Sequence, residues 1–451
     1  MANNLLTHAY ITNESLDVLE NKLVFARGVD RQYSPEFAEA GAKIGYTINV
    51  RRPPRYIGTF GPALNVEDTN ETYLPVTLTS QFHVDVQYTT ADKLLSMDMF
   101  RERVIAPVIA TVANRVDSDG LYFGYQNTAN SVGTPGIPLA SFLPPALARG
   151  ILSAEAANTD ITPQFCIDPI TNAYASDGIK GLYNPQAKIG EVVERGLIAK
   201  QFAGLDWYED QNVVTFTTGA QGGSPTLNGN TTGAFISTGW ANNGFIQTTG
   251  WSATTGVVKV GDVIQIAGVY PANPQSRTQY GNFLKQFVVL PPAGYAVQPS
   301  GAASPGLVFN PATLTTGTFN ASTGVYTSSG GGGLSILIGE ACITGGQFQN
   351  VVTTGAFASN SALTVNGGTG NAGKASPQAM VYMKNAFALG FADLPLPGGV
   401  IEAARANDAD IGMSIRLITQ YTINNDSEPT RADVLYGYAG LYRSMAVRIA
   451  C

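Results

Sequence analysis

The stretch that decides the fold is YTINVRRPPRYIGTFGP, at residues 46–62. From Tyr46 to Val50 apolar residues alternate with polar ones, as in a strand with one buried face. The two prolines at 53 and 54 then exclude a helix and favour an extended chain. Alternation returns between Thr77 and Gln87. The whole region from Ala42 to Val86 therefore predicts two strands joined by a long projecting loop.

Both ends of this loop carry charge. The charged residues are Arg51, Arg52 and Arg55 on the outgoing side and Glu67, Asp68 and Glu71 on the returning side. Three arginines beside two prolines also suit a nucleic-acid contact or an ordinary solvated loop. The acidic residues on the same loop favour a protein–protein contact, because they can pair with a neighbouring copy of the chain. The sequence therefore predicts an interface here.

Residues Thr90 to Asp117 form the clearest predicted helix. Thr89 or Thr90 can cap it, and Asp92 in the first turn suits the helix dipole. We expect Pro107 to kink a rod about 40 Å long. Its apolar residues recur in steps of three or four: Met97, Phe100, Val104, Val108, Val112 and Val116.

Other elements follow from shorter patterns. A short helix is predicted over Asn13–Val24, and further helices over Ser141–Ala157, Pro185–Ala203 and, weakly, MVYMKNAFALGF at 380–391. The segment QFCIDPIT at 164–171 predicts a buried strand that ends at Pro169. Near the C-terminus, two strand-like runs flank the turn cluster NNDSEP at 424–429, which predicts a long antiparallel hairpin.

A composition break separates Gln211–Gly373 from the rest of the chain. In the whole chain of 451 residues, charged residues make up only 13%, well below the usual figure of about 25%. They are scarcest in this segment. Gly, Thr, Ser and Asn dominate the segment between short β-prone runs, so we expect an all-β module inserted into an α+β parent fold. Its only charged residues are Lys259, Asp262, Arg277, Lys285 and Glu340.

Composition excludes several classes of protein. The net charge is −7 and no Lys/Arg-rich tail exists, so strong nucleic-acid binding is not expected. The first residues lack the pattern of a signal peptide, and no window of about 18 apolar residues predicts a membrane span. Cys166, Cys342 and Cys451 are far apart and odd in number, which opposes a disulfide framework and favours a reducing cytoplasm.

No catalytic, metal-binding or cofactor-binding set is predicted. The two histidines, His8 and His83, stand apart from any metal or triad spacing. GTGNAGKA at 368–375 approaches a P-loop, but Ala375 replaces the Mg²⁺-binding Ser or Thr and Pro377 opposes the helix that must follow. We expect this segment to be a linker that closes the inserted module.

Taken in chain order, the N-terminal segment, the hairpin, the long helix and the C-terminal strands resemble the Hong Kong 97 type capsid fold. This is an α+β fold with an N-terminal arm, an E-loop hairpin, a spine helix, and axial and peripheral domains. The resemblance implies this division: 1–42 N-terminal arm, 43–88 E-loop hairpin, 89–137 peripheral domain with the spine helix, 138–217 first part of the axial domain, 218–375 inserted all-β (β-barrel) domain, and 376–451 remainder of the axial and peripheral domains.

Two stretches carry a closer resemblance. GLIAKQFAGLDWYEDQNVVTFTTG at 196–219 and WSATTGVVKVGDVIQIAGV at 251–269 are similar to the start of the inserted β-barrel in podovirus coat proteins of the Salmonella phage P22 type. In that family, charged loops of the insertion are thought to pair across neighbouring capsomers. Here the insertion is nearly uncharged, so we expect contact through backbone and apolar surface, or no contact.

The resemblance implies a major capsid protein that assembles into pentamers and hexamers of an icosahedral head around double-stranded DNA, without sequence-specific DNA binding, an enzymatic activity or a membrane. The loop arginines are expected to pair with carboxylates of a neighbour. Asn425, Asp426 and Glu428 are expected to meet other subunits near local threefold axes. Further partners implied are a scaffolding protein, a portal and, optionally, a decoration protein, with assembly in the bacterial cytoplasm and a final place in the virion.

Three alternatives stay open at this point. An encapsulin-type compartment shares the fold but stores a protein cargo. A β-rich fibre or adhesin suits the Gly/Thr/Ser-rich segment but not the helix at 90–117. A P-loop enzyme needs the segment that ends at Lys374 to bind a nucleotide.

Overall fold

A computed structural model describes residues 23–31, 47–89, 106–158, 160–179, 201–228, 240, 243–251, 258–291, 295–297, 303–305, 318–320, 325–327, 334–353, 360–408 and 413–451. The chain divides into two compact units, which are described separately. Unit 1 comprises Met1–Val50, Tyr73–Gly120 and Phe387–Leu441. Unit 2 comprises Arg51–Thr72, Leu121–Ala386 and Tyr442–Cys451.

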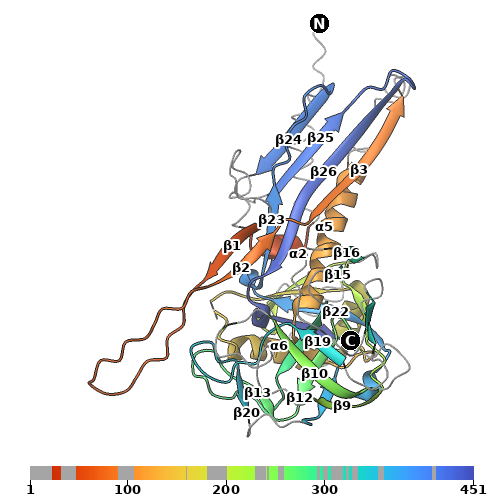
Figure 1. Ribbon diagram of the computed structural model, residues 1–451. Helices are drawn as coiled ribbons and strands as arrows, with labels where there is room; N and C mark the ends of the chain where they lie inside the picture. The colour runs from red at the N-terminus through yellow and green to blue at the C-terminus, as the bar shows by residue number, and fades with distance from the viewer. Residues whose placement is uncertain are drawn as a thin grey trace, which may run out of the picture. The chain divides into compact units, whose positions relative to one another are not determined.

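Unit 1 is organised around one long strand, β26 (Ser427–Gly440). One edge of β26 pairs with β3 (Ser80–Thr89), and the other pairs first with β25 (Met413–Thr419) and then with β23 (Phe387–Ala392). Strand β24 (Glu402–Asp408) lies outside β25 (Figure 1). The hairpin of β25 and β26 confirms the predicted C-terminal hairpin.

Helix α5 (Ala106–Asn127) confirms the existence of the spine helix but not its end. Val112 and Val116 of the predicted stripe are buried. The predicted end at Asp117 is wrong, because the helix continues through Gly120, where any side chain would meet the ring of Tyr438. Residues 90–105 lie outside the described residues, so the start of the predicted helix and a kink at Pro107 are not described.

The predicted hairpin exists, but its returning strand is not the predicted one. Strand β1 (Thr47–Arg52) pairs with β2 (Thr72–Thr77), and the Thr47 and Thr77 hydroxyl oxygens lie 3.0 Å apart. The alternating run at 77–87 mostly forms β3, which pairs with β26. Alternation alone identifies a strand but not its partner, which here lies far along the chain.

Unit 2 contains a seven-stranded mixed sheet, called the core sheet below. Its strands are β4 (Asn130–Gly133), β27 (Ala446–Ala450), β22 (Ala375–Tyr382), β5 (Gln164–Ile167), β7 (Leu205–Glu209) and β6 (Gln201–Phe202) in spatial order, with β8 (Thr215–Thr217) also paired to β22. Helix α6 (Leu143–Ala154) confirms the helix predicted at 141–157. The core beneath contains Phe165, Trp207 and Ile449.

Three shorter predictions need correction. The weak helix at 380–391 is wrong, because these residues belong to β22 and β23 with one turn of 3₁₀ helix (Lys384–Ala386) between them. The helix at 185–203 cannot include Gln201 and Phe202, which form β6; residues 180–200 are outside the described part. The strand at 164–171 ends at Ile167, and Pro169 begins helix α7 (Pro169–Ile179), as suits proline in a first helical turn.

The segment 218–375, called the β-rich segment below, is built from strands and turns wherever it is described, plus a 3₁₀ turn at Thr369–Asn371. Its six-stranded sheet runs β21 (Leu363–Val365), β12 (Val263–Ile266), β14 (Gln286–Leu290), β19 (Leu334–Ile338), β10 (Gly244–Trp251) and β9 (Gly223–Leu227). The segment also contains a three-stranded sheet of β11 (Val258–Lys259), β18 (Val325–Thr327) and β17 (Thr318–Asn320). Two further pairs of strands are β13 (Val269–Pro271) with β20 (Val351–Thr353), and β15 (Tyr295–Val297) with β16 (Ala303–Pro305).

The hairpin, the spine helix and the C-terminal hairpin thus occur in the order that the Hong Kong 97 type resemblance implies. Most of the helix predicted at 13–24 lies outside the described residues; the described helix nearby is the short α2 (Phe25–Gly28). In the part of the chain that is described, no helix is long and apolar enough to cross a membrane.

The close approach of Gly437 in β26 to the backbone at the end of β2 yields a prediction. A side chain at Gly437 would lie 2.1 Å from the carbonyl oxygen of Thr77 and 2.9 Å from the Cα of Leu78, which are backbone atoms that cannot rotate away. Gly437→Ala should therefore lower the free energy of unfolding by about 1–3 kcal/mol, measured by urea denaturation. Gly398→Ala is the control, because nothing lies within 4 Å of its added carbon; equal effects of the two substitutions would contradict the close approach.

Candidate assembly interface

The hairpin loop, residues 53–71, has no strand of its own but is held in shape by internal hydrogen bonds. The backbone N–H groups of Ile57 and Gly58 donate to the carboxylate of Glu67, at 2.7 and 2.5 Å. The hydroxyl oxygens of Tyr56 and Thr69 lie 3.0 Å apart. The outgoing and returning halves of the loop are thus tied to each other, and Glu67 is used within its own subunit.

The charged residues at the base also find partners within the chain. Arg51 and Glu71 face each other at 3.8 Å, but their side chains are 83% and 55% exposed, so the pair contributes at most about 1 kcal/mol. Arg52 lies 5.0 Å from the ring centre of Trp240 and 4.6 Å from that of Tyr442. Burial lowers the pKa of Arg52, although Tyr442 and Glu340 act in the opposite direction.

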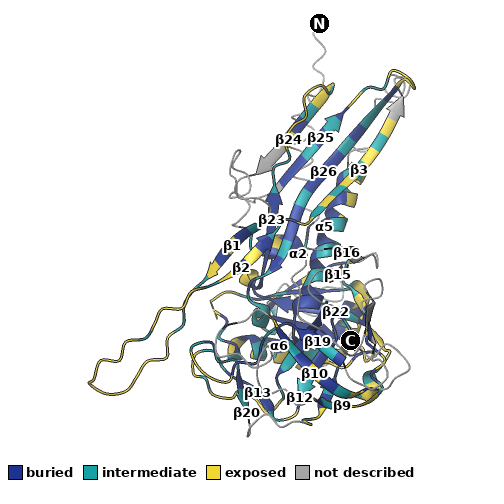
Figure 2. Ribbon diagram, viewed as in Figure 1, coloured by how far each residue is buried: buried dark blue, intermediate teal, exposed yellow. Residues whose placement is uncertain are grey.

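The far part of the loop exposes large apolar side chains. Phe60 is fully exposed, Leu64 is 91% exposed and Val66 is 78% exposed. Figure 2 shows exposed residues along nearly the whole loop. Sequence reasoning weighted the charges and missed these residues. The available signal was the run YIGTFGPALNV at 56–66, which places apolar side chains where no strand partner was predicted.

The second predicted contact region is the turn before β26, which belongs to unit 1. The hydroxyl of Tyr421 donates to Asp426 at 3.0 Å, and Asn425 is exposed. Ile423 beside them is 82% exposed. Here too an apolar side chain accompanies the predicted polar ones, and a role for Asn425, Asp426 and Glu428 at an interface stays a prediction.

A buried charge cluster connects the β-rich segment to the core sheet's helix α6. The Lys285 ammonium lies 3.4 Å from the Glu155 carboxylate, with side chains only 3% and 4% exposed, and 3.9 Å from Glu340. The Tyr280 hydroxyl also donates to Glu155. Burial alone lowers the pKa of Lys285, but the two carboxylates outweigh it and raise that pKa, so the lysine stays charged.

All five charged residues between Gln211 and Gly373 act at junctions. Lys285 and Glu340 belong to the cluster described above. Lys259 donates through its ammonium to the Thr217 carbonyl, and Asp262 accepts from the N–H of Gly219, so both hold the point where the β-rich segment begins. Arg277 donates to the Tyr56 carbonyl of the hairpin loop.

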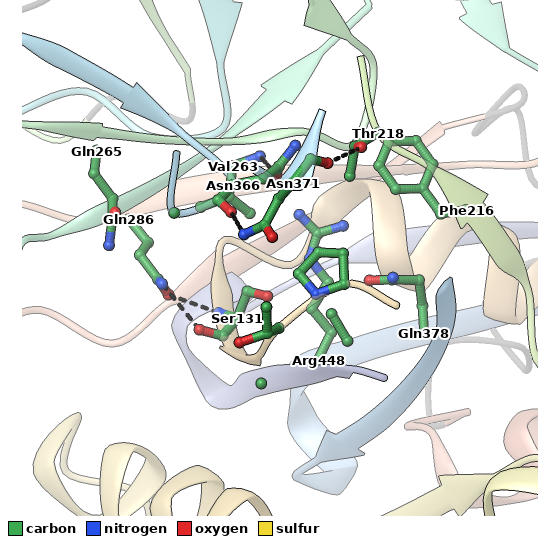
Figure 3. Close-up of a pocket in the computed structure, with 15 residues that line it drawn as sticks. Ser131, Phe216, Thr218, Val263, Gln265, Gln286, Asn366, Asn371, Gln378 and Arg448 are labelled. Atoms are coloured by element: carbon green, nitrogen blue, oxygen red, sulfur yellow. Dashed lines mark hydrogen bonds between the residues drawn. The ribbon is translucent and has the colours of Figure 1, made fainter. Parts of the chain in front are cut away.

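A cavity of about 370 Å³ lies between the core sheet and the β-rich segment (Figure 3). Ser131, Gln378 and Arg448 line one side, and Gln286 and Asn366 line the other. Buried Arg448 donates to the Tyr125 and Gly261 carbonyls, and burial lowers its pKa to about 10, which leaves it positively charged. Amides and hydroxyls dominate the lining, which suits ordered water.

Nothing in the described ranges resembles a catalytic or metal centre. No group of three or more His, Cys, Asp or Glu among these residues is placed to hold a metal ion. His83 sits in β3 beside Asp85, half exposed. Lys374 is followed by strand β22 rather than a helix, so the segment 368–375 is not a P-loop; the bond from Gly373 N–H to the Gly219 carbonyl joins the two ends of the β-rich segment.

Comparison with known proteins decides the family. The profile described as "P22 coat protein - gene protein 5" matches residues 1–301. The chain belongs to the P22 coat protein family. It is therefore a bacteriophage major capsid protein, which forms the head shell. No protein with a curated description matches the chain significantly.

Solved structures similar to this coat protein come from several phages. One titled "Mycobacterium phage Che8" shares 8% identity and a TM-score of 0.42, with 95% of this chain and 90% of that chain covered. The "Capsid structure of the Cyanophage P-SCSP1u" shares 7% identity and a TM-score of 0.42, with 95% and 88% covered. The "Asymmetric unit of bacteriophage PhiM1 mature capsid" shares 10% identity and a TM-score of 0.36, with 95% and 86% covered.

The buried cluster makes a prediction about the stability of the coat protein. Lys285→Ala leaves the Glu155 carboxylate buried without its cation, so the free energy of unfolding should fall by about 3–5 kcal/mol. Lys259→Ala is the matched control, because that exposed ammonium makes one hydrogen bond to a carbonyl and its loss should cost about 1 kcal/mol. Urea denaturation of the monomer measures both. A cost for Lys285→Ala no larger than the control's would show that the cluster does not hold the junction.

Proposed function

We propose that this coat protein assembles into the pentamers and hexamers of an icosahedral head, and that the hairpin loop is the arm by which each subunit binds a neighbouring copy. The observation that supports this role is the exposure of Phe60, Leu64 and Val66 on a loop whose shape is already set. The three side chains lie close together in the sequence of one loop, and apolar side chains gathered on an exposed surface are typical of a protein–protein contact.

The apolar side chains supply most of the expected contact energy. Full burial of a residue such as Phe60 or Leu64 contributes about 1.5–3 kcal/mol. An exposed ion pair made by Arg51 or Arg55 contributes only about 0–1 kcal/mol. The charged residues therefore select orientation and partner more than they add affinity. The contact recurs in every subunit of a closed shell, so a modest energy per loop is multiplied across the particle.

Further partners follow from the shell role. A scaffolding protein and a portal are expected during assembly in the bacterial cytoplasm, and a decoration protein on the finished head is compatible with it. A net charge of −7 supports enclosure of DNA without sequence-specific binding. The family match favours a viral shell over a cargo-storing compartment. We propose a structural role without enzymatic activity, because the family is one of coat proteins.

The test removes the apolar contact without touching the fold. Phe60→Ser combined with Leu64→Ser should reduce the yield of shells at least about tenfold, because it removes about 3–6 kcal/mol of burial per loop. The yield is measured by sedimentation and electron microscopy after expression with the phage's scaffolding protein. Circular dichroism should show an unchanged monomer.

Phe60→Leu combined with Leu64→Met is the control, because both substitutions keep the apolar character, and it should retain assembly. Shells formed at the normal yield by the double serine variant would sink the proposal that this loop is the assembly arm.

A further inference from the structure

We infer that the β-rich segment is a positioning device for the hairpin loop of its own subunit, and that Trp240, Arg277 and Gln347 are its positioning residues. The inference rests on the proposed role of the loop in assembly. It assigns to the β-rich segment a task within one subunit, in place of the contacts between capsomers that a more charged insertion could make.

The base of the loop is held by stacking. The Arg52 guanidinium contacts both Trp240 of the β-rich segment and Tyr442, near the core sheet. Such cation–π contacts strengthen when the cation is partly removed from water, as the half-buried Arg52 is. Trp240 itself packs on the apolar cluster of Ala341, Ile343 and Phe348. The loop therefore leaves its strand from a fixed point.

The outgoing half of the loop is held by Arg277, which donates through Nη2 to the Tyr56 carbonyl at 2.6 Å. Arg277 sits in a tight turn with φ of +55°, a conformation that costs energy for a non-glycine residue. Asn273 stabilises the turn by accepting from the N–H groups of Gln275 and Ser276, and it donates to the Ala154 carbonyl at the end of α6. The guanidinium is thus presented to the loop by a turn anchored on the core.

The returning half is held in the same way. Gln347 donates through Nε2 to the Asp68 carbonyl at 2.8 Å. Its own segment is fixed by Asn350, whose side chain accepts from the Ile343 N–H and donates to the Ala341 carbonyl. Both halves of the loop are therefore bound by side chains of the β-rich segment, through loop backbone carbonyls.

These contacts should favour assembly by reducing its entropic cost. A loop that is free in the monomer must be ordered when it binds a neighbour, and the ordering is subtracted from the contact energy. A loop already held at its base and on both halves loses less freedom on binding. The expected consequence is a lower concentration threshold for assembly.

The test uses the full-length coat protein with Arg277→Asn and Gln347→Ala combined. Asparagine tolerates a positive φ, so the turn should persist while the guanidinium is lost. Hydrogen–deuterium exchange of the monomer, read on peptides covering residues 53–71, should accelerate by about tenfold at Ile57 and Gly58 with the rest of the chain unchanged. The assembly threshold should rise several-fold. Gln275→Ala is the control, because its exposed side chain belongs to the same turn and the bond that Gln275 makes to Asn273 uses its backbone N–H, which alanine keeps.

The outcomes separate the inference from the proposed function. Unchanged loop exchange in the monomer would overturn the inference, whatever happens to assembly. Faster loop exchange with a normal assembly threshold would show that these contacts hold the loop without helping assembly, which overturns the positioning role and leaves the proposed function to be decided by the double serine variant. Faster exchange together with impaired assembly, and neither effect in the control, supports both.

Discussion

The buried interaction of Lys285 with Glu155 and Glu340 is the constraint on which the β-rich segment depends. A lysine and a glutamate taken out of water are costly unless each satisfies the other, so the cluster fixes a single position for strand β14 against the end of α6. Arg443 extends the cluster: burial lowers its pKa to about 10, against the opposing effect of Glu340. The hairpin loop leaves its strand beside this cluster, because Arg52, Glu155, Lys285 and Glu340 line one small cavity.

The scarcity of charge in the β-rich segment has a structural explanation. Its few charged side chains all serve attachment: to the start of the segment, to α6, or to the hairpin loop. The rest of the segment is rich in Gly, Thr, Ser and Asn. A segment of this composition folds through its own apolar sheet core, which includes Ile264, Phe287 and Ile336. Its charged side chains stand where the position of the segment must be specified.

Local patterns in the sequence predicted the elements, and failures arose where a distant partner decides. The spine helix and the C-terminal hairpin follow from periodicity and turn residues. The returning strand of the hairpin and the strands at 380–391 did not, because the same alternation suits any partner, and β26 lies far along the chain from β3. At the interface, the arginines and acidic residues were visible from composition, but their partners within the subunit were not. The run at 56–66 was a sequence signal for Phe60 and Leu64, but their exposure was established only when the structure showed that no strand covers them.

The measurement that tests this account most directly is electron cryomicroscopy of the assembled shell at side-chain resolution. The account predicts that Phe60, Leu64 and Val66 are buried against a neighbouring copy, while Arg277 and Gln347 still bind the loop of their own subunit. A map in which the tip of the loop faces solvent, or in which the loop leaves Arg277 and Gln347, would contradict it.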